Sequence, residues 1–183
     1  MHRARLLPGL CAFAAVSAIA TASHAFERQW HLGADLGWSA VSHKTSIDGQ
    51  ERIFGGYGAG GHLVYGLNDT FNAMLEVGVS GHPIYSNRPW MTVASGAAGV
   101  SYTLDILRWV PYAGLLVGGY HFSAVGHDKA ETKLGFQLAL GLDYAFNRSW
   151  AMGVQLRYHT FADDPFSAHY MTTFGRFEYR WGW

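Results

Sequence analysis

The sequence has little charge. Only 14% of its 183 residues are Asp, Glu, Lys or Arg, and the 13 basic residues equal the 13 acidic ones. A soluble domain usually has about a quarter charged residues, so we predict that much of this surface faces something other than water. The lack of a basic excess argues against nucleic acid as a partner. The hydrophobic content of 49% argues against a disordered chain.

Long apolar runs and cysteine are also scarce. No stretch after residue 25 reaches the roughly 18 consecutive apolar residues of a membrane-spanning helix. The single cysteine, Cys11, precedes that point. A chain that begins after residue 25 therefore has no disulfide to stabilise it, and its stability must come from the fold or from the bilayer.

The N-terminal segment has the features of a secretion signal. Arg3 and Arg5 form a basic start, the stretch 6–20 carries no charge, and small residues precede residue 26. We predict a cleaved signal peptide over residues 1–25. The remainder, residues 26–183, shows no linker or low-complexity run and is predicted to be one domain.

What the sequence does have is alternation with a period of two. From Trp30 to Ala40 every second residue is apolar, and those between are small or polar, which is typical of a strand with two different faces. Seven further segments of this kind follow, at 57–67, 71–79, 90–104, 112–122, 134–144, 150–158 and 177–183. Their connections alternate between short ones, at 68–69, 105–109 and 146–149, and longer ones, at 42–52, 81–89, 123–132 and 162–168.

Aromatic residues gather near both ends of these predicted strands. One group comprises Trp30, Tyr65, Phe71, Tyr102, Trp109, Tyr112, Tyr144, Phe146, Trp150, Trp181 and Trp183, and the other Trp38, Tyr57, Trp90, Tyr120, Phe122, Tyr158, Phe161 and Tyr170. Two aromatic rings about one bilayer apart, with alternating short and long connections, are typical of outer-membrane barrels. Because an open sheet edge in lipid would leave backbone groups unpaired, we predict an all-β fold: a closed eight-stranded antiparallel transmembrane β-barrel.

The charged residues of the predicted strands fall on the face opposite to the apolar set. They are Asp35, Glu76, Asp143, Arg157, Arg176, Glu178 and Arg180, and we predict that they form a polar network in the lumen, beside His31, His62, Asn72, His121, Gln137, Gln155 and His159. Strand five is predicted to turn Tyr112, Leu116, Tyr120 and Phe122 to the lipid. Many inward positions are glycine, so two interpretations stay open: a salt-bridged plug, or a narrow conduit or ligand cavity.

Over residues 29–183 the chain resembles the small eight-stranded outer-membrane barrels of the OmpA, OmpX and OmpW type. The residues that carry the resemblance are Pro111-Tyr112-Ala113-Gly114, Gly141-Leu142-Asp143-Tyr144 and the segment 177–183. The resemblance implies an outer-membrane protein, monomeric and without a cofactor, with both termini in the periplasm. Its implied role is structural or surface-interaction, with loops that meet ligands or lipopolysaccharide. An OmpW-like conduit for small solutes is the alternative.

The C-terminal segment also resembles the signal that the barrel-assembly machinery recognises in its clients. Aromatic residues stand there at every second position, Phe177, Tyr179, Trp181 and Trp183. We therefore predict the assembly machinery as a partner, together with outer-membrane lipid.

A catalytic role is a further alternative, because some barrels of this size act on lipid A. The deacylase PagL carries a His-x-Ser pair, whereas Ser167-Ala168-His169 has the reversed order, with His159 nearby. A nucleophilic serine needs a base within hydrogen-bond reach. We predict no enzyme, with Ser167, His169 and His159 as the candidates if one exists. The predicted long loops contain His43, His82, His127 and His169, but no pair has tight ligand spacing, and we predict no metal site.

Overall fold

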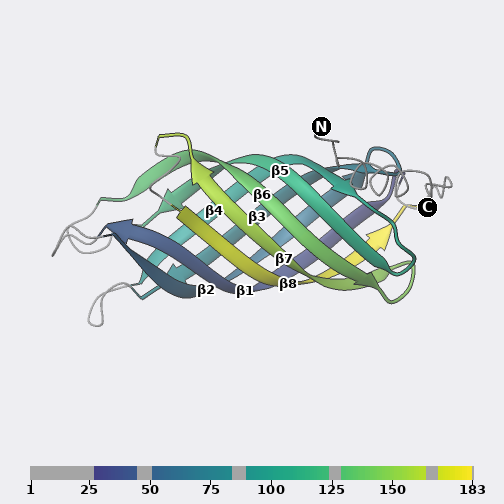
Figure 1. The fold of residues 1–183 in the computed structure, drawn as a ribbon, viewed down its shortest axis with the longest axis horizontal. Helices are drawn as coiled ribbons and strands as arrows, with labels where there is room; N and C mark the ends of the chain where they lie inside the picture. Colours follow the sequence, from purple (N-terminus) through teal and green to yellow (C-terminus); the bar gives the residue numbers. More distant parts are fainter. Residues whose placement is uncertain (1–26, 45–50, 84–89, 124–128, 164–168, 183) are drawn as a thin grey trace, which may run out of the picture.

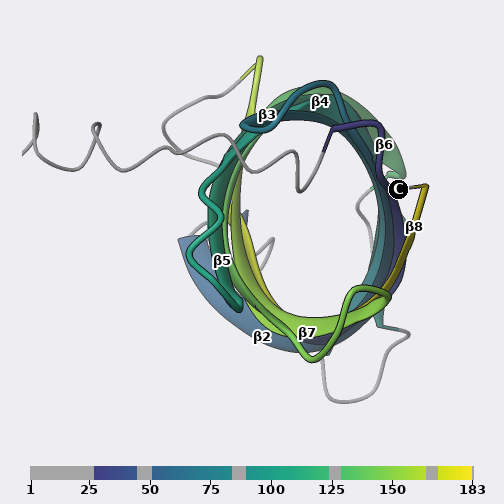
Figure 2. The same cartoon turned by 90° about the vertical axis from the view of Figure 1, so that its right-hand side faces the viewer.

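A computed structural model describes residues 27–44, 51–83, 90–123, 129–163 and 169–182. Eight antiparallel strands pair in sequence order and close into one barrel through β1 and β8, which confirms the predicted fold class (Figures 1 and 2). The strands are β1 (Trp30–Lys44), β2 (Glu51–Gly66), β3 (Phe71–His82), β4 (Met91–Thr103), β5 (Trp109–Phe122), β6 (Glu131–Ala145), β7 (Trp150–Phe161) and β8 (His169–Trp181).

No helix in the described part of the chain is long and apolar enough to cross a membrane.

The short connections lie together at the end of the barrel where β1 begins and β8 ends (Figure 1). They span residues 67–70, 104–108 and 146–149. We call this the terminal end, and the opposite one the loop end. Towards the loop end the strands are longer than the pattern predicts: β2 begins at Glu51 and β8 at His169. Neighbouring strands supply backbone partners there, so pairing continues where the apolar alternation has stopped.

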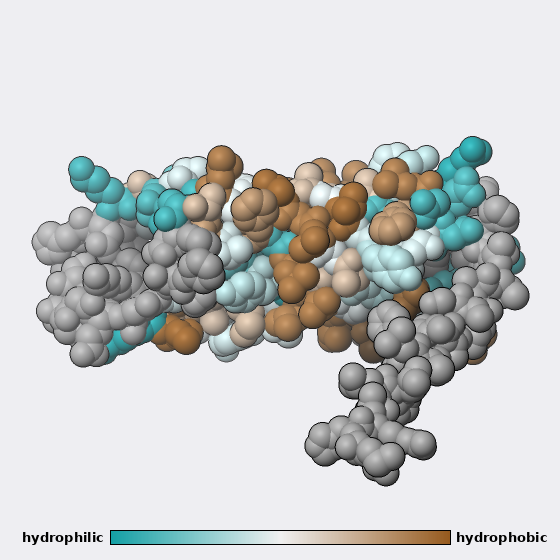
Figure 3. Space-filling view, turned by 45° about the horizontal axis from the view of Figure 1, so that its top comes forward, coloured by the Kyte–Doolittle hydropathy of each residue, from teal (hydrophilic) through white to brown (hydrophobic). Residues whose placement is uncertain are grey.

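The outer face of the barrel is apolar. Every strand exposes large apolar or aromatic side chains, among them Leu36, Val77, Leu138 and Val154. Figure 3 shows such hydrophobic side chains gathered around the middle of the visible face, with hydrophilic residues towards both ends. An apolar belt between polar ends matches a hydrocarbon layer between two aqueous phases.

In strand β5 the prediction of which side faces lipid is wrong. Leu115 is 66% exposed, whereas Leu116 and Tyr120 are buried in the interior and His121 is on the outer face. Tyr112 is buried as well. The run Leu115-Leu116-Val117 is apolar on both faces, so alternation could not separate the two sides.

The turns at the terminal end use two designs. In the β2–β3 turn the side-chain oxygen of Asn68 accepts hydrogen bonds from the backbone N–H groups of Thr70 and Phe71 at 2.9 and 2.8 Å. Asn147 closes the β6–β7 turn in the same way. In the β4–β5 turn Leu107 adopts a φ of 61°. That left-handed conformation costs a residue with a β-carbon about 1–2 kcal/mol.

Candidate functional site in the barrel interior

The middle of the barrel holds a cluster of buried charges around Arg157. Its guanidinium donates to Asp35 Oδ2 of β1 at 2.5 Å, and its Nε lies 3.1 Å from Glu76 Oε2 of β3. Glu76 also accepts hydrogen bonds from the amide groups of Gln155, at 2.8 Å, and Gln137. Residues from four strands thus satisfy one carboxylate and one guanidinium that have almost no contact with solvent.

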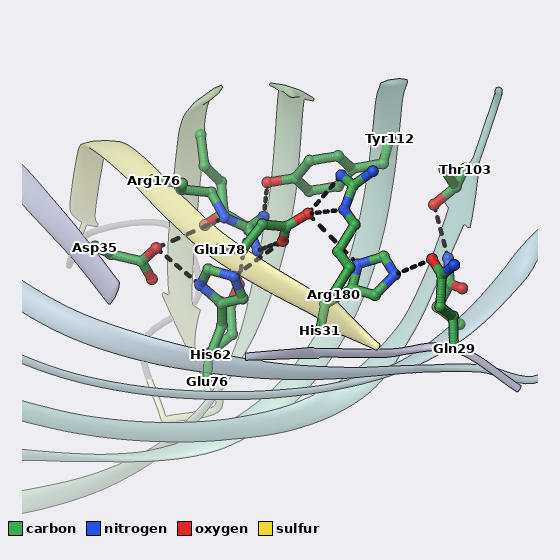
Figure 4. Close-up of polar contacts among 12 residues, drawn as sticks. Gln29, His31, Asp35, His62, Glu76, Thr103, Tyr112, Arg176, Glu178 and Arg180 are labelled. Carbon is green, nitrogen blue, oxygen red and sulfur yellow. Dashed lines mark hydrogen bonds and ion pairs between the residues drawn. The ribbon is translucent and has the colours of Figure 1, made fainter. Parts of the chain in front are cut away.

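Glu178 of β8 organises the part of this cluster nearer the terminal end (Figure 4). Its Oε1 accepts from Arg180 at 2.5 Å and lies 3.5 Å from His31 Nδ1. Its Oε2 lies 3.2 Å from His62 Nε2 and 3.7 Å from Arg176 Nη2. Four basic side chains therefore surround a single buried carboxylate.

His62 lies between two carboxylates. Its Nδ1 is 2.9 Å from Asp35 Oδ1, and its Nε2 faces Glu178. An ionised carboxylate can only accept hydrogen bonds, so both ring nitrogens must donate, as only an imidazolium can. The positive charge of such a ring lies beside two carboxylates, Asp35 and Glu178, which also contact Arg176. Buried charges require partners of opposite sign in this way.

A small pocket lies beside the cluster, towards the terminal end. Asp143, Asn72, Tyr112 and Arg176 are among its lining residues. Within the described residues Asp143 Oδ1 and Asn72 Oδ1 are buried without a hydrogen-bond partner. Unsatisfied acceptors around a polar pocket are typical of an ordered-water site.

Arg176 contacts the aromatic ring of Tyr112, which also lines the pocket. Its guanidinium donates to the hydroxyl of Tyr112 and stands 5.0 Å from the centre of the same ring. Arg157 is placed similarly, 5.0 Å from the ring of Phe174. Aromatic faces stabilise such cations, so the ion cluster is packed as well as paired.

Towards the loop end the interior becomes apolar. A cluster of buried side chains crosses the lumen there, formed by Val41, Met91, Val93, Tyr120, Phe161 and Tyr170. Tyr120 is 0% exposed, and its hydroxyl is 2.9 Å from His159 Nδ1. We call these six residues the apolar plug. The aromatic prediction placed Tyr120, Phe161 and Tyr170 in a lipid-facing ring, and the structure corrects it.

His82 also lies inside the barrel and not in a loop. It is fully buried at the end of β3, with Nε2 3.0 Å from the Ser80 hydroxyl and Nδ1 3.2 Å from the Phe54 carbonyl oxygen. Among the described residues no group of three or more His, Cys, Asp or Glu side chains could hold a metal ion.

Of the three residues considered for catalysis, His159 is the one whose side chain the structure describes. His159 is buried in the lumen against Tyr120. The backbone of His169 pairs with Thr160, and Ser167 lies outside the described residues. Of the predicted assembly signal, Phe177 and Tyr179 are exposed on the outer face. Trp181 stacks with Tyr179, and Trp183 is outside the described residues.

The interior positions of Tyr112, Tyr120, Phe161 and His82 were not predicted from the sequence. The inward face of β5 could have been predicted from β6, where the polar residues Gln137 and Asp143 mark the side that faces the lumen. Residues paired across antiparallel strands face the same side, so their partners in β5, Leu116 and Val110, also face the lumen. The length of β3 beyond Val79 had no comparable marker, because the sequence there is Ser-Gly-His-Pro.

Comparison with known proteins gave one family and several solved structures that share one fold. A model of the outer membrane protein beta-barrel domain matches residues 9–175. None of the curated proteins matches the chain by sequence.

Solved structures with the same fold have low sequence identity. Neisserial surface protein A (NspA) is 15% identical, with a TM-score of 0.66 over 82% of this chain and 96% of its own. Ail, the attachment invasion locus protein of Yersinia pestis, is 14% identical, with a TM-score of 0.58 over 85% and 99%. OprG from Pseudomonas aeruginosa is 12% identical, with a TM-score of 0.54 over 88% and 100%.

Proposed function

The chain belongs to the family of outer membrane protein β-barrel domains, and we propose that its barrel is a sealed anchor that holds surface loops at the outer membrane. Family membership confirms the predicted location, and the apolar outer belt makes membrane lipid its contact. The proposed role is therefore structural or surface-interaction.

The observation that carries this proposal is the filled lumen. The apolar plug occupies the loop end, and the ion cluster occupies the middle. A second group of buried side chains, Val64, Met74, Ala97, Tyr112, Leu116 and Ala139, packs between strands of the central and terminal parts. Eight strands leave an interior just wide enough for side chains, and here large side chains take up that width at the plug.

The proposed contacts outside the barrel are lipopolysaccharide and surface ligands. The same fold is compatible with ligand contact, since Ail has also been solved in complex with the heparin analogue sucrose octasulfate. We also propose a monomer, and the barrel-assembly machinery as a partner through Phe177, Tyr179, Trp181 and Trp183.

Planar bilayer recording tests the sealed lumen against the conduit alternative. The wild-type barrel is expected to give no discrete conductance steps. A Tyr120→Ala, Phe161→Ala variant empties part of the plug and is expected to give intermittent steps. The matched control, Leu115→Ala with Val117→Ala, changes only the outer face and stays silent. Regular steps from the wild type would refute the proposal and favour a conduit.

A further inference from the structure

The β4–β5 turn differs from the two other turns at the terminal end. Those two have polar tips, each closed by an asparagine side chain. The β4–β5 turn is a tight hairpin in which Ile106 and Trp109 exchange backbone hydrogen bonds of 3.0 Å around Leu107 and Arg108. Glycine is the usual residue where such a tip needs positive φ, yet leucine stands there.

The turn also exposes four apolar side chains beside its two charged residues, Asp105 and Arg108. Leu107 is 94% exposed, and Leu104, Ile106 and Trp109 beside it are exposed as well. Because the Leu107 side chain is almost fully exposed, burial within the barrel does not offset the cost of its backbone conformation. A contact outside the chain would account for it.

The apolar surface of the turn continues the lipid-facing belt. Trp109 packs against Tyr144 of β6, with ring centres 4.9 Å apart, and Tyr144 against Phe146 at 5.5 Å. These rings form part of the aromatic group at the terminal end, where a membrane–water interface is expected. Ile106 and Leu107 extend this aromatic group further from the barrel. Two residues of extended chain span about 7 Å.

Arg108 gives the same turn a cation. Its side chain is exposed, and its Nη1 reaches back to the Tyr144 hydroxyl at 3.4 Å. The guanidinium therefore lies beside the aromatic interface and not out in bulk solvent. Planar guanidinium groups bind phosphate in bidentate fashion, and a phosphate layer lies just outside the aromatic zone of a bilayer.

We propose that the β4–β5 turn docks on the phospholipid leaflet at the terminal end of the barrel: Ile106 and Leu107 enter the interfacial zone, and Arg108 with Tyr144 binds a lipid phosphate. Membrane lipid is the partner that fits this turn, because its exposed apolar side chains continue the membrane-facing belt and Arg108 supplies a cation for a phosphate.

A depth measurement tests the apolar part. Residues 26–183 contain no cysteine, so Leu107→Cys can be labelled uniquely with an environment-sensitive fluorophore and folded into phosphatidylethanolamine and phosphatidylglycerol vesicles. Arg148→Cys, in the β6–β7 turn, is the matched control. We expect blue-shifted emission at position 107, loss of quenching by iodide, and quenching by nitroxide lipids. Equal iodide quenching at both positions would mean that the tip lies in water, and would overturn docking on lipid.

Native mass spectrometry of the folded protein tests the phosphate contact. Arg108→Gln is expected to lower the number of phosphatidylglycerol molecules retained, whereas Arg108→Lys retains part of them and Arg148→Gln matches the wild type. Heat-dependent gel migration first shows that every variant is folded. Equal retention by Arg108→Gln and Arg148→Gln would refute the phosphate site, even if the depth measurement held.

Discussion

Replacement of Arg157 by methionine is the sharpest test of the ion cluster. The change keeps a long side chain beside Phe174 but removes the only arginine that contacts Glu76 in the described network. Asp35 keeps His62 and Arg176 as partners at 2.9 and 3.6 Å. Breaking a buried ion pair by removing one partner costs about 3–5 kcal/mol, and here most of that loss should fall on Glu76.

A second variant separates the charge from the packing. Glu76→Gln in the Arg157→Met background removes the uncompensated carboxylate while the amides of Gln137 and Gln155 remain beside it. We expect the double variant to recover about 0.5–3 kcal/mol, the range of coupling between groups in one network.

The assay is equilibrium urea unfolding of the barrel in lipid vesicles, followed by tryptophan fluorescence and by the gel shift between folded and unfolded forms. The free energy of unfolding is compared among the wild type, both single variants and the double variant. Strictly additive losses, or a loss below about 1 kcal/mol for Arg157→Met, which is typical of an exposed pair, would refute the account of the cluster.

Further predictions concern other parts of the barrel. Leu138→Arg on the outer face should cost about 2–4 kcal/mol in the same assay if the residue lies at the midplane; a neutral result would contradict the lipid contact of β6. Leu116→Ala should lower the free energy of unfolding by about 2–5 kcal/mol, as truncation of a buried side chain does, and Leu115→Ala should lower it much less. The reverse order would mean that Leu116 faces lipid, as predicted from the sequence. Nitrogen-15 NMR of His62 should show protons on both ring nitrogens at neutral pH, and a single protonated nitrogen would refute the imidazolium. Lipid A mass spectra should be the same with and without the protein; loss of an acyl chain that Ser167→Ala abolishes would establish an enzyme.

The sequence carried enough information to predict the architecture. Period-two alternation, a polar set on one face and the rhythm of short and long connections predict the eight strands and their closure. Seven charged residues predicted to face the lumen are all buried in the structure. Charge is an unambiguous marker because an ionised group cannot face hydrocarbon.

The apolar plug could not be predicted in the same way. Tyr120, Phe161 and Tyr170 are suited equally to a lipid interface and to a packed interior, since each is a large ring. The side that each ring faces depends on how its strand is paired with its neighbours. The alternation within one strand gives no information about that pairing. The individual contacts of Glu178 and His62 were likewise beyond the sequence, because they join residues 116 positions apart.

The position of the charges along the chain has a consequence for how the barrel is made. Asp35, His62 and Glu76 belong to the first three strands, whereas Arg157, Arg176, Glu178 and Arg180 belong to the last two. A sheet that has gained β1 to β6 but not its final pair holds three lumen acids, Asp35, Glu76 and Asp143, and none of the arginines of the ion cluster. Such an intermediate gains little from leaving water, and the last hairpin supplies all three of those arginines at once. Closure and neutralisation thus become a single late event, so a barrel that stalls before its seventh strand should remain unable to compact.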